Sequence, residues 1–224
     1  MEKFIEFIFG SLLALFPIVD PIGSVPIFLT LTASASDRVR HQFARRTALN
    51  VMVVLIVFLL VGGWILRFFG ISLEVVRIAG GIVVFHAAWQ TMNAKPKLSR
   101  QENQGAIHSI DHHEDISFMP MTIPMLAGPG SIAVTLGLSA QAGRDLSVAT
   151  TLNLIAAAIA IAVLSLIIYL CLRSSSYLLK VLGERGISAM SRIMGLFILA
   201  IGVQLILNGI ADWLEMVALV SAAI

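Results

Sequence analysis

Long stretches without a charged side chain constrain this chain more than any other feature of its sequence. Five of them are at least 17 residues long, at 47–66, 78–94, 117–140, 146–172 and 193–211. A further stretch, 7–36, contains a single charge, Asp20. About 20 apolar residues of helix cross a bilayer core of about 30 Å, and in lipid the helix satisfies its own backbone hydrogen bonds. We therefore predict an all-α, polytopic membrane protein with six transmembrane helices, at roughly 5–31, 47–67, 72–93, 117–140, 146–172 and 190–213.

Composition excludes several other classes of protein. Of the 224 residues, 58% are hydrophobic and 12% are charged, which is about half the charged fraction of an ordinary soluble domain. A single cysteine, Cys171, excludes a disulfide scaffold, and a net charge of +2 provides no basic surface for a nucleic acid. Nothing in the sequence predicts a cofactor. The histidines and acidic residues of 95–116 have no defined metal-site spacing, and this segment is predicted to be a cytoplasmic linker loop.

Lysine and arginine are distributed unequally between the predicted connections. Eleven of the 15 follow spans 1, 3 and 5, and the other four lie on the opposite side. Because basic residues accumulate in cytoplasmic loops, both termini are predicted to lie on the side away from the cytoplasm.

Two segments of the first half recur in the second half in the same order. The segment 17–24 (PIVDPIGS) is matched 107 residues later by 124–131 (PMLAGPGS), and the pattern GIS followed by RIAG at 70–80 is matched by GIS followed by RIMG at 186–195. Each half has three spans, an odd number, so the second repeat must be inverted relative to the first. We expect 1–94 to form the first three-helix repeat and 117–224 to form the second.

The prolines of spans 1 and 4 predict that both helices are broken. Each span has three prolines with glycines beside them: Pro17, Pro21 and Pro26, and Pro120, Pro124 and Pro129. Proline removes a backbone donor, and broken backbone in a membrane is tolerated where protein or a water-filled cavity covers it. Paired broken helices in two inverted halves mark the substrate site of many transporters. We therefore expect a substrate site at Asp20, Pro21, Gly23, Ser24, Gly128, Pro129, Gly130 and Ser131, the alternative being prolines that only kink the helices.

Asp20 is the only acidic residue deep in a predicted span. A carboxylate there faces a cavity or a partner rather than lipid, so it could coordinate a cation or an ammonium group, or carry a proton. The alternative, which is compatible with these roles, is that Asp20 caps the start of a half-helix. The hydroxyls of Ser24 and Ser131 could likewise bind a substrate or the carbonyl groups that the break frees.

Three further polar residues are secondary candidates for the site. His86 lies near the middle of span 3, where the alternative role is a satisfied contact between helices. Arg77 and Arg192 are equivalent in the repeat, and they could pair with Asp20 or an anionic ligand, or extend to the lipid headgroups. The glycines at 62–63, 80–81, 195 and 202 are expected to allow close contact between helices.

These features favour a transporter over an enzyme. A di-aspartyl protease needs two carboxylates, but the repeat equivalent of Asp20 is Ala127, and the chain has no nucleophile-elbow, zincin or phosphate-loop motif. We predict a transporter of a small polar substrate, and six helices are few for a complete pathway, which favours a homodimer. The alternative is a non-transporting membrane scaffold or stress sensor, whose break residues would be packed without water.

The segments that carry these predictions also resemble a known family. DPIG at 20–23, AGPG at 127–130, the two GIS segments, and GVQ at 202–204 with NG at 208–209 are similar to the MarC family (UPF0056) of bacterial inner-membrane proteins over nearly the whole chain. The resemblance implies six helices in two inverted triplets, a bacterial inner membrane with periplasmic termini, and kinship with the LysE-type amino-acid exporter superfamily. It implies no established substrate, and export of an amino acid or a similar polar metabolite is the expectation.

Overall fold

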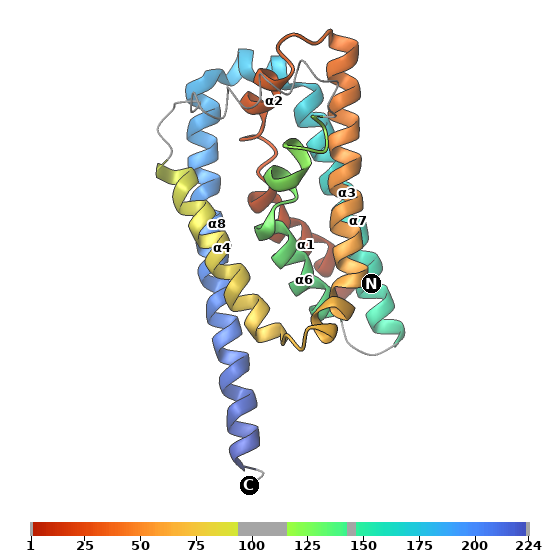
Figure 1. The fold of residues 1–224 in the computed structure, drawn as a ribbon, viewed down its shortest axis with the longest axis vertical. Coiled ribbons are helices and arrows are strands. Elements are labelled where there is room, and N and C mark those ends of the chain that lie inside the picture. The colour runs from red at the N-terminus through yellow and green to blue at the C-terminus, as the bar shows by residue number, and fades with distance from the viewer. Residues whose placement is uncertain (1, 94–115, 143–146, 223–224) are drawn as a thin grey trace.

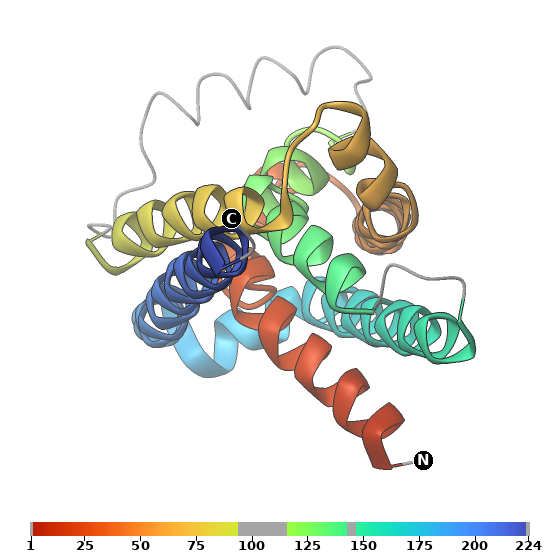
Figure 2. The same cartoon turned by 90° about the horizontal axis from the view of Figure 1, so that it is seen from below.

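The computed structural model describes residues 2–93, 116–142 and 147–222, and within these ranges every regular element is helical (Figures 1 and 2). The all-α prediction is confirmed for this part of the chain. The elements in chain order are α1 Glu2–Val19, α2 Val25–Leu31, α3 Asp37–Phe68, α4 Leu73–Asn93, the π-helical turn η1 Met121–Leu126, α6 Pro129–Ala142, α7 Val148–Arg173 and α8 Ser175–Ala222. The predicted linker 95–116 lies outside the described residues except for Ile116.

Within the described residues, four helical stretches are long and apolar enough to cross a membrane, namely α3, α4, α7 and Arg185–Ala218 of α8. They cover the predicted spans at 47–67, 72–93, 146–172 and 190–213. Helix α3 begins ten residues before its predicted span, because the charged residues that precede it are themselves good helix formers. The connection predicted between spans 5 and 6 is also helical, and it turns sharply at Gly183, where φ is 65°.

The other two predicted spans are interrupted, as the prolines indicated. In the first, α1 ends at Val19, Asp20 has a φ of 43°, and α2 begins at Val25. In the second, Ile123 has extended dihedral angles inside η1, and Ala127 and Gly128 separate η1 from α6. Each segment has a proline in its interior, which removes regular backbone hydrogen bonds. Each segment therefore forms two helical pieces rather than one continuous helix.

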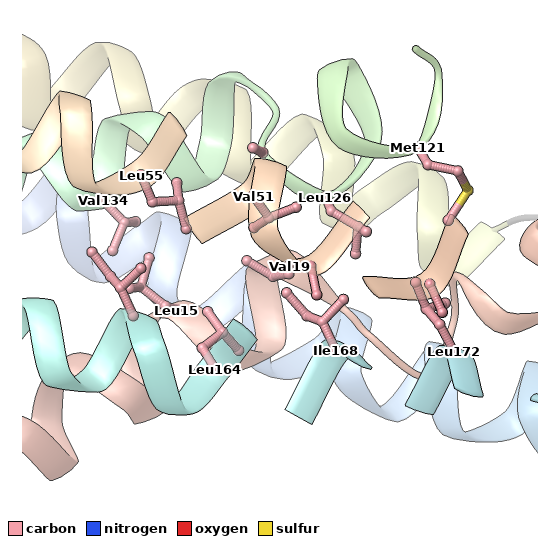
Figure 3. Close-up of a cluster of buried hydrophobic side chains, with 14 of the residues drawn as sticks. Leu15, Val19, Val51, Leu55, Met121, Leu126, Val134, Leu164, Ile168 and Leu172 are labelled. Atoms are coloured by element: carbon pink, nitrogen blue, oxygen red, sulfur yellow. The ribbon is translucent and has the colours of Figure 1, made fainter. Parts of the chain in front are cut away.

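The breaks in these segments lie inside the bundle, whereas the first turns of α1 project from it (Figure 2). Helix α4 runs beside α8 and α3 beside α7, while α1 and α6 pack against each other and against those pairs (Figures 1 and 2). The main buried cluster joins α1, α3, α6 and α7 and includes both break regions. Figure 3 shows Val19, at the end of α1, and Leu126, at the end of η1, in this cluster with Val51, Leu164 and Ile168.

Helices α4 and α8 approach closely along a row of glycines. A methyl group added at Gly202 would lie 2.8 Å from the Phe85 backbone nitrogen and 3.0 Å from the Gly81 carbonyl oxygen. One added at Gly209 would lie 2.8 Å from the Glu74 carbonyl, and one at Gly195 would lie 3.5 Å from the Ala88 carbonyl. The three α8 glycines are seven residues apart, so they occupy one face of the helix. The packing role expected for the glycines at 81, 195 and 202 is therefore confirmed. The same expectation is wrong for Gly63, where a methyl group would meet nothing within 4 Å.

The outward faces of the long helices carry large apolar side chains. Trp64 and Phe68 of α3 are 74% and 84% exposed, and Leu166, Leu196 and Leu207 are each more than half exposed. A surface of this kind suits contact with lipid rather than water.

Candidate functional site

Asp20 lies at the first break, and its carboxylate organises the turn there. Its Oδ1 atom accepts a hydrogen bond of 3.0 Å from the backbone nitrogen of Gly23. Its own backbone nitrogen still donates to the Phe16 carbonyl, and its carbonyl accepts from the Ser24 nitrogen. Asp20 therefore caps the turn that leads into α2, as one of the two sequence interpretations proposed.

Two other helices reach this carboxylate. A methyl group at Gly23 would collide with the Asp20 carboxylate and lie 2.7 Å from the Ser191 hydroxyl of α8. Cys171, on α7, is half-buried, and α7 packs against both α1 and α2. Asp20 is half-buried, so the first break presents a carboxylate near the Ser191 hydroxyl, where α7, α8 and the α1–α2 turn meet.

Ser24 and Ser131 make the same hydrogen bond at equivalent places in the two breaks. The Ser24 hydroxyl donates to the Pro21 carbonyl over 2.7 Å, and the Ser131 hydroxyl lies 3.0 Å from the Gly128 carbonyl. Both bonds connect a serine to the carbonyl three residues before it, and the same offset of 107 relates both serines and both carbonyls. Ser131 also lies 3.1 Å from the Leu126 carbonyl. Both serines are about 98% buried, and their hydroxyls bond to carbonyl groups of their own break: Pro21 for Ser24, and Leu126 and Gly128 for Ser131, where the Gly128 carbonyl also accepts from the Ile132 nitrogen.

We expect the loss of either serine hydroxyl to cost about 0.5–1.5 kcal/mol, because a buried carbonyl then loses its donor. Thermal unfolding of the purified Ser24→Ala and Ser131→Ala variants measures this. Ser34→Ala, an exposed serine between α2 and α3, is the matched control. A variant that kept full stability but lost metabolite release would instead indicate a hydroxyl that contacts the substrate.

The second break lies close to the first without being chemically equivalent to it. A methyl group at Gly130 would touch Ile18 of α1 and Val84 of α4, at 3.4 and 3.2 Å. Gly128 is packed against the Pro124 carbonyl, Pro129 is exposed, and Ala127, the repeat equivalent of Asp20, is fully buried. The structure thus brings the two breaks together in the bundle, and only the first supplies a charged group.

The secondary candidates lie elsewhere. The ring of His86 is on the exposed face of α4 and pairs with Gln90 over 2.8 Å. Arg77 forms an ion pair with Asp212 of α8 rather than with Asp20. Arg192 is exposed, which fits the alternative in which it extends to the headgroups.

Three residues of this arrangement escaped the sequence analysis. Ser191 and Cys171 lie on α8 and α7, which pack beside the first break, and no local pattern reveals this packing. Asp212 had a sequence signal, because it is the acidic residue that ends the charge-free stretch 193–211.

Comparison with known proteins identifies the family. The sequence model for MarC family integral membrane proteins matches residues 5–214. The chain belongs to the MarC family. A UPF0056 membrane protein of Methanocaldococcus jannaschii is 38% identical over 88% of this chain and 92% of its own length. The UPF0056 membrane protein YvbG of Bacillus subtilis is 34% identical over 92% and 94%, and YhcE of Escherichia coli is 32% identical over 94% and 95%. No solved structure matches this MarC family chain.

Proposed function

We propose that this MarC family protein is a membrane transporter, built from two inverted three-helix repeats, that exports an amino acid or a similar small polar metabolite. In this proposal it is not an enzyme, and it lies in a bacterial inner membrane with both termini in the periplasm. The repeats are α1 to α4 and η1 to α8, and each interrupted pair, α1 with α2 and η1 with α6, counts as one crossing.

The observation that carries the proposal is the matched pair of helix breaks. Each break lies inside the bundle, follows a proline-containing segment at the equivalent position of its half, and is closed by the same serine-to-carbonyl hydrogen bond. Interrupted helices at corresponding places of two inverted repeats are the usual setting of a transporter substrate site. A helix bundle with no moving part has no need of two such breaks.

The packing of the helices supports the inverted relationship. Equivalent helices of an inverted repeat run antiparallel, and α4 and α8 do so, because Glu74 meets Gly209 and Ala88 meets Gly195 at opposite ends of the contact. In the proposed repeat, α4 of the first half corresponds to α8 of the second half, and the first break corresponds to the second break. The contacts agree with this correspondence: the first break lies against α8 through Gly23 and Ser191, and the second break lies against α4 through Gly130 and Val84.

The chemistry of the first break suits a zwitterionic substrate. The Asp20 carboxylate attracts an ammonium group, while the backbone N–H groups at the start of the half-helix near Gly130 attract a carboxylate. Rocking of one repeat against the other would expose this site to each side in turn. Six crossings are few for a complete transport pathway, and in this proposal a second copy of the chain completes it in a homodimer.

One observation favours the second candidate function, a non-transporting scaffold or sensor. Ser24, Gly128 and Ser131 are buried, and both hydroxyls are bonded to carbonyl groups of their own break. This is the packing expected of a purely structural break. It is also the packing expected of a transporter in a closed state, so a measurement of flux decides between the two.

The deciding experiment profiles small polar metabolites in the medium and cytosol of cells with and without the chain. Two variants separate the roles of Asp20: Asp20→Asn keeps an acceptor for the Gly23 nitrogen and removes the charge, whereas Asp20→Ala removes both. We expect a metabolite to accumulate outside cells with the intact protein and not with either variant, while Asp20→Asn is still found folded in the membrane. Equal profiles with and without the chain would contradict transport and favour the scaffold.

A further inference from the structure

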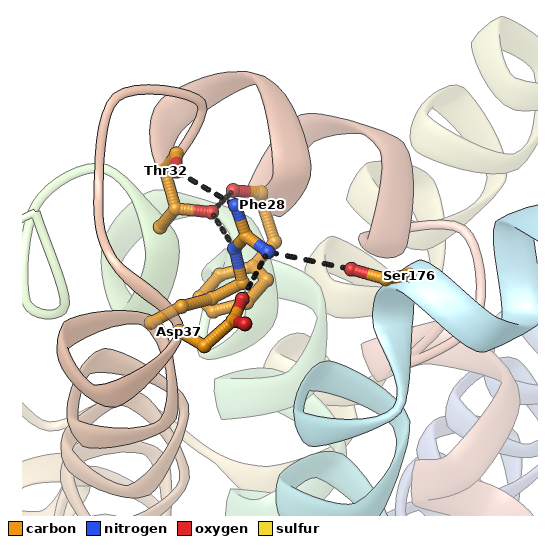
Figure 4. A network of polar contacts seen from close by, with 5 residues as sticks. Phe28, Thr32, Asp37 and Ser176 are labelled. Carbon is orange, nitrogen blue, oxygen red and sulfur yellow. Dashed lines mark hydrogen bonds and ion pairs between the residues drawn. The ribbon is translucent and has the colours of Figure 1, made fainter.

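Thr32, Asp37 and Ser176 lie close together near the C-terminal end of the short helix α2 (Figure 4), and Arg40, in the first turns of α3, hydrogen-bonds to all three. Its Nε and Nη2 atoms donate to the hydroxyl and the carbonyl of Thr32, at 3.3 and 3.2 Å. Its Nη1 atom donates to Asp37 Oδ1 at 3.2 Å and to Ser176 Oγ at 3.4 Å. Only 17% of the side chain is exposed, so the guanidinium group is built into the fold rather than solvated.

The position of α2 depends on contacts at its two ends. A helix of seven residues is not stable by its own hydrogen bonds. At its start it is held by the Asp20 turn and by the contact of Gly23 with Ser191. At its end Thr32 is fully buried and bonds back to the Phe28 carbonyl, and the Arg40 cation is placed favourably at the negative end of the helix.

The same guanidinium connects the two halves of the chain. Thr32 and Asp37 belong to the first half, whereas Ser176 lies in the first turn of α8, 136 residues from Arg40. Helix α2 therefore approaches α8 at both ends, through the close packing of Gly23 and Ser191 at its start and through the Arg40–Ser176 bond at its end. The Ser176 bond is the longest of the four that Arg40 makes, and Ser176 itself is exposed, so this bond is the easiest of them to release.

We propose that Arg40 is the positioning residue of the first break, and that its bond to Ser176 is a latch that holds α2, and with it Asp20, in the closed arrangement. The role of this latch depends on the proposed transport function. Its existence is testable without any transported substrate, because the chain has a single cysteine next to the break.

The test measures the rate at which a maleimide labels the native Cys171 in membranes that contain the full chain. Cys171 is half-buried on α7, which packs against α1 and α2, so displacement of α2 should expose it. We expect Ser176→Ala, which removes the bond of Arg40 to the second half and leaves its other bonds in place, to raise the labelling rate about two- to tenfold, the range that corresponds to one net hydrogen bond. Arg40→Ala should raise the labelling rate at least as much. Arg40→Lys keeps the positive charge but not the planar guanidinium group with its several donors, so its labelling rate should lie between those of Arg40→Ala and the native chain.

Ser174→Ala is the matched control, because this exposed serine bonds only to the Leu170 carbonyl of its own helix, and it should label at the native rate. A native labelling rate in Ser176→Ala would overturn the latch, whether or not Arg40→Ala folds. That outcome would leave the transport proposal standing, because transport is judged from metabolite release and the Asp20 variants. Conversely, faster labelling with no metabolite release would support the latch and contradict transport.

Discussion

Gly202→Leu is expected to prevent stable assembly of the bundle. A side chain at position 202 would enter space held by the Phe85 nitrogen and the Gly81 carbonyl, at 2.8 and 3.0 Å from its first carbon. These are backbone atoms of α4, so no rotamer change can make room, and the two helices must separate along their whole contact. Overpacking of a core typically costs about 1–3 kcal/mol, and we expect this substitution at or above the upper limit. The yield of monodisperse protein in detergent and its thermal unfolding temperature measure the effect.

Gly63→Leu is the matched control for this prediction. Gly63 also lies in a membrane-spanning helix, but a methyl group there meets nothing within 4 Å. Since leucine favours the helix more than glycine does, this variant should be at least as stable as the native chain. If Gly202→Leu behaved like Gly63→Leu, the close contact of α4 with α8 would be wrong, and with it the antiparallel pairing that supports the inverted repeat.

Removal of Arg77 is expected to produce the second large loss of stability. Arg77 is 14% exposed and pairs with Asp212, which is 37% exposed, across the contact between α4 and α8. Breaking a buried ion pair costs about 3–5 kcal/mol, because one charge stays behind without its partner, whereas exposed pairs contribute about 0.2–1 kcal/mol. The partial exposure of Asp212 places Arg77→Met between these limits, at about 1–3 kcal/mol.

A double-mutant cycle isolates the contribution of the pair. Arg77→Met with Asp212→Leu should be more stable than Arg77→Met alone, because no unpaired carboxylate remains. Arg67→Met, which removes an exposed arginine near the end of α3, controls for the loss of one positive charge. Additive effects in the cycle would mean that the two groups do not interact, and that Arg77 acts only through its contact with the glycine face of α8.

The sequence predicted the parts of the fold that depend on local chemistry. Helices α4 and α7 begin and end within two residues of the predicted spans, because each is bounded by polar residues and carries no break. The breaks were located correctly, since proline acts on its own backbone whatever surrounds it. The helical start of α3 was missed, because its charged residues resemble a loop when judged by hydropathy.

The candidate site could be predicted only in part, because proximity in space depends on packing between distant segments. The cap formed by Asp20 and the bonds of Ser24 and Ser131 are local, and both were among the sequence-based alternatives. The approach of Ser191 and Cys171 to Asp20 depends on how α7 and α8 are placed, and the face on which His86 lies depends on the rotation of α4. A single sequence has no signal for these relationships.

The charge-free part of helix α8 matches the thickness of a bilayer core. The 19 residues between Arg192 and Asp212 carry no charge, and at the rise of an α-helix these two residues are about 30 Å apart, the thickness of the hydrocarbon layer. The helix does not end there, and its last turns project beyond the rest of the molecule (Figure 1). Because Arg77 ties α4 to the Asp212 end of this span, a thicker or thinner bilayer would act directly on the contact between α4 and α8.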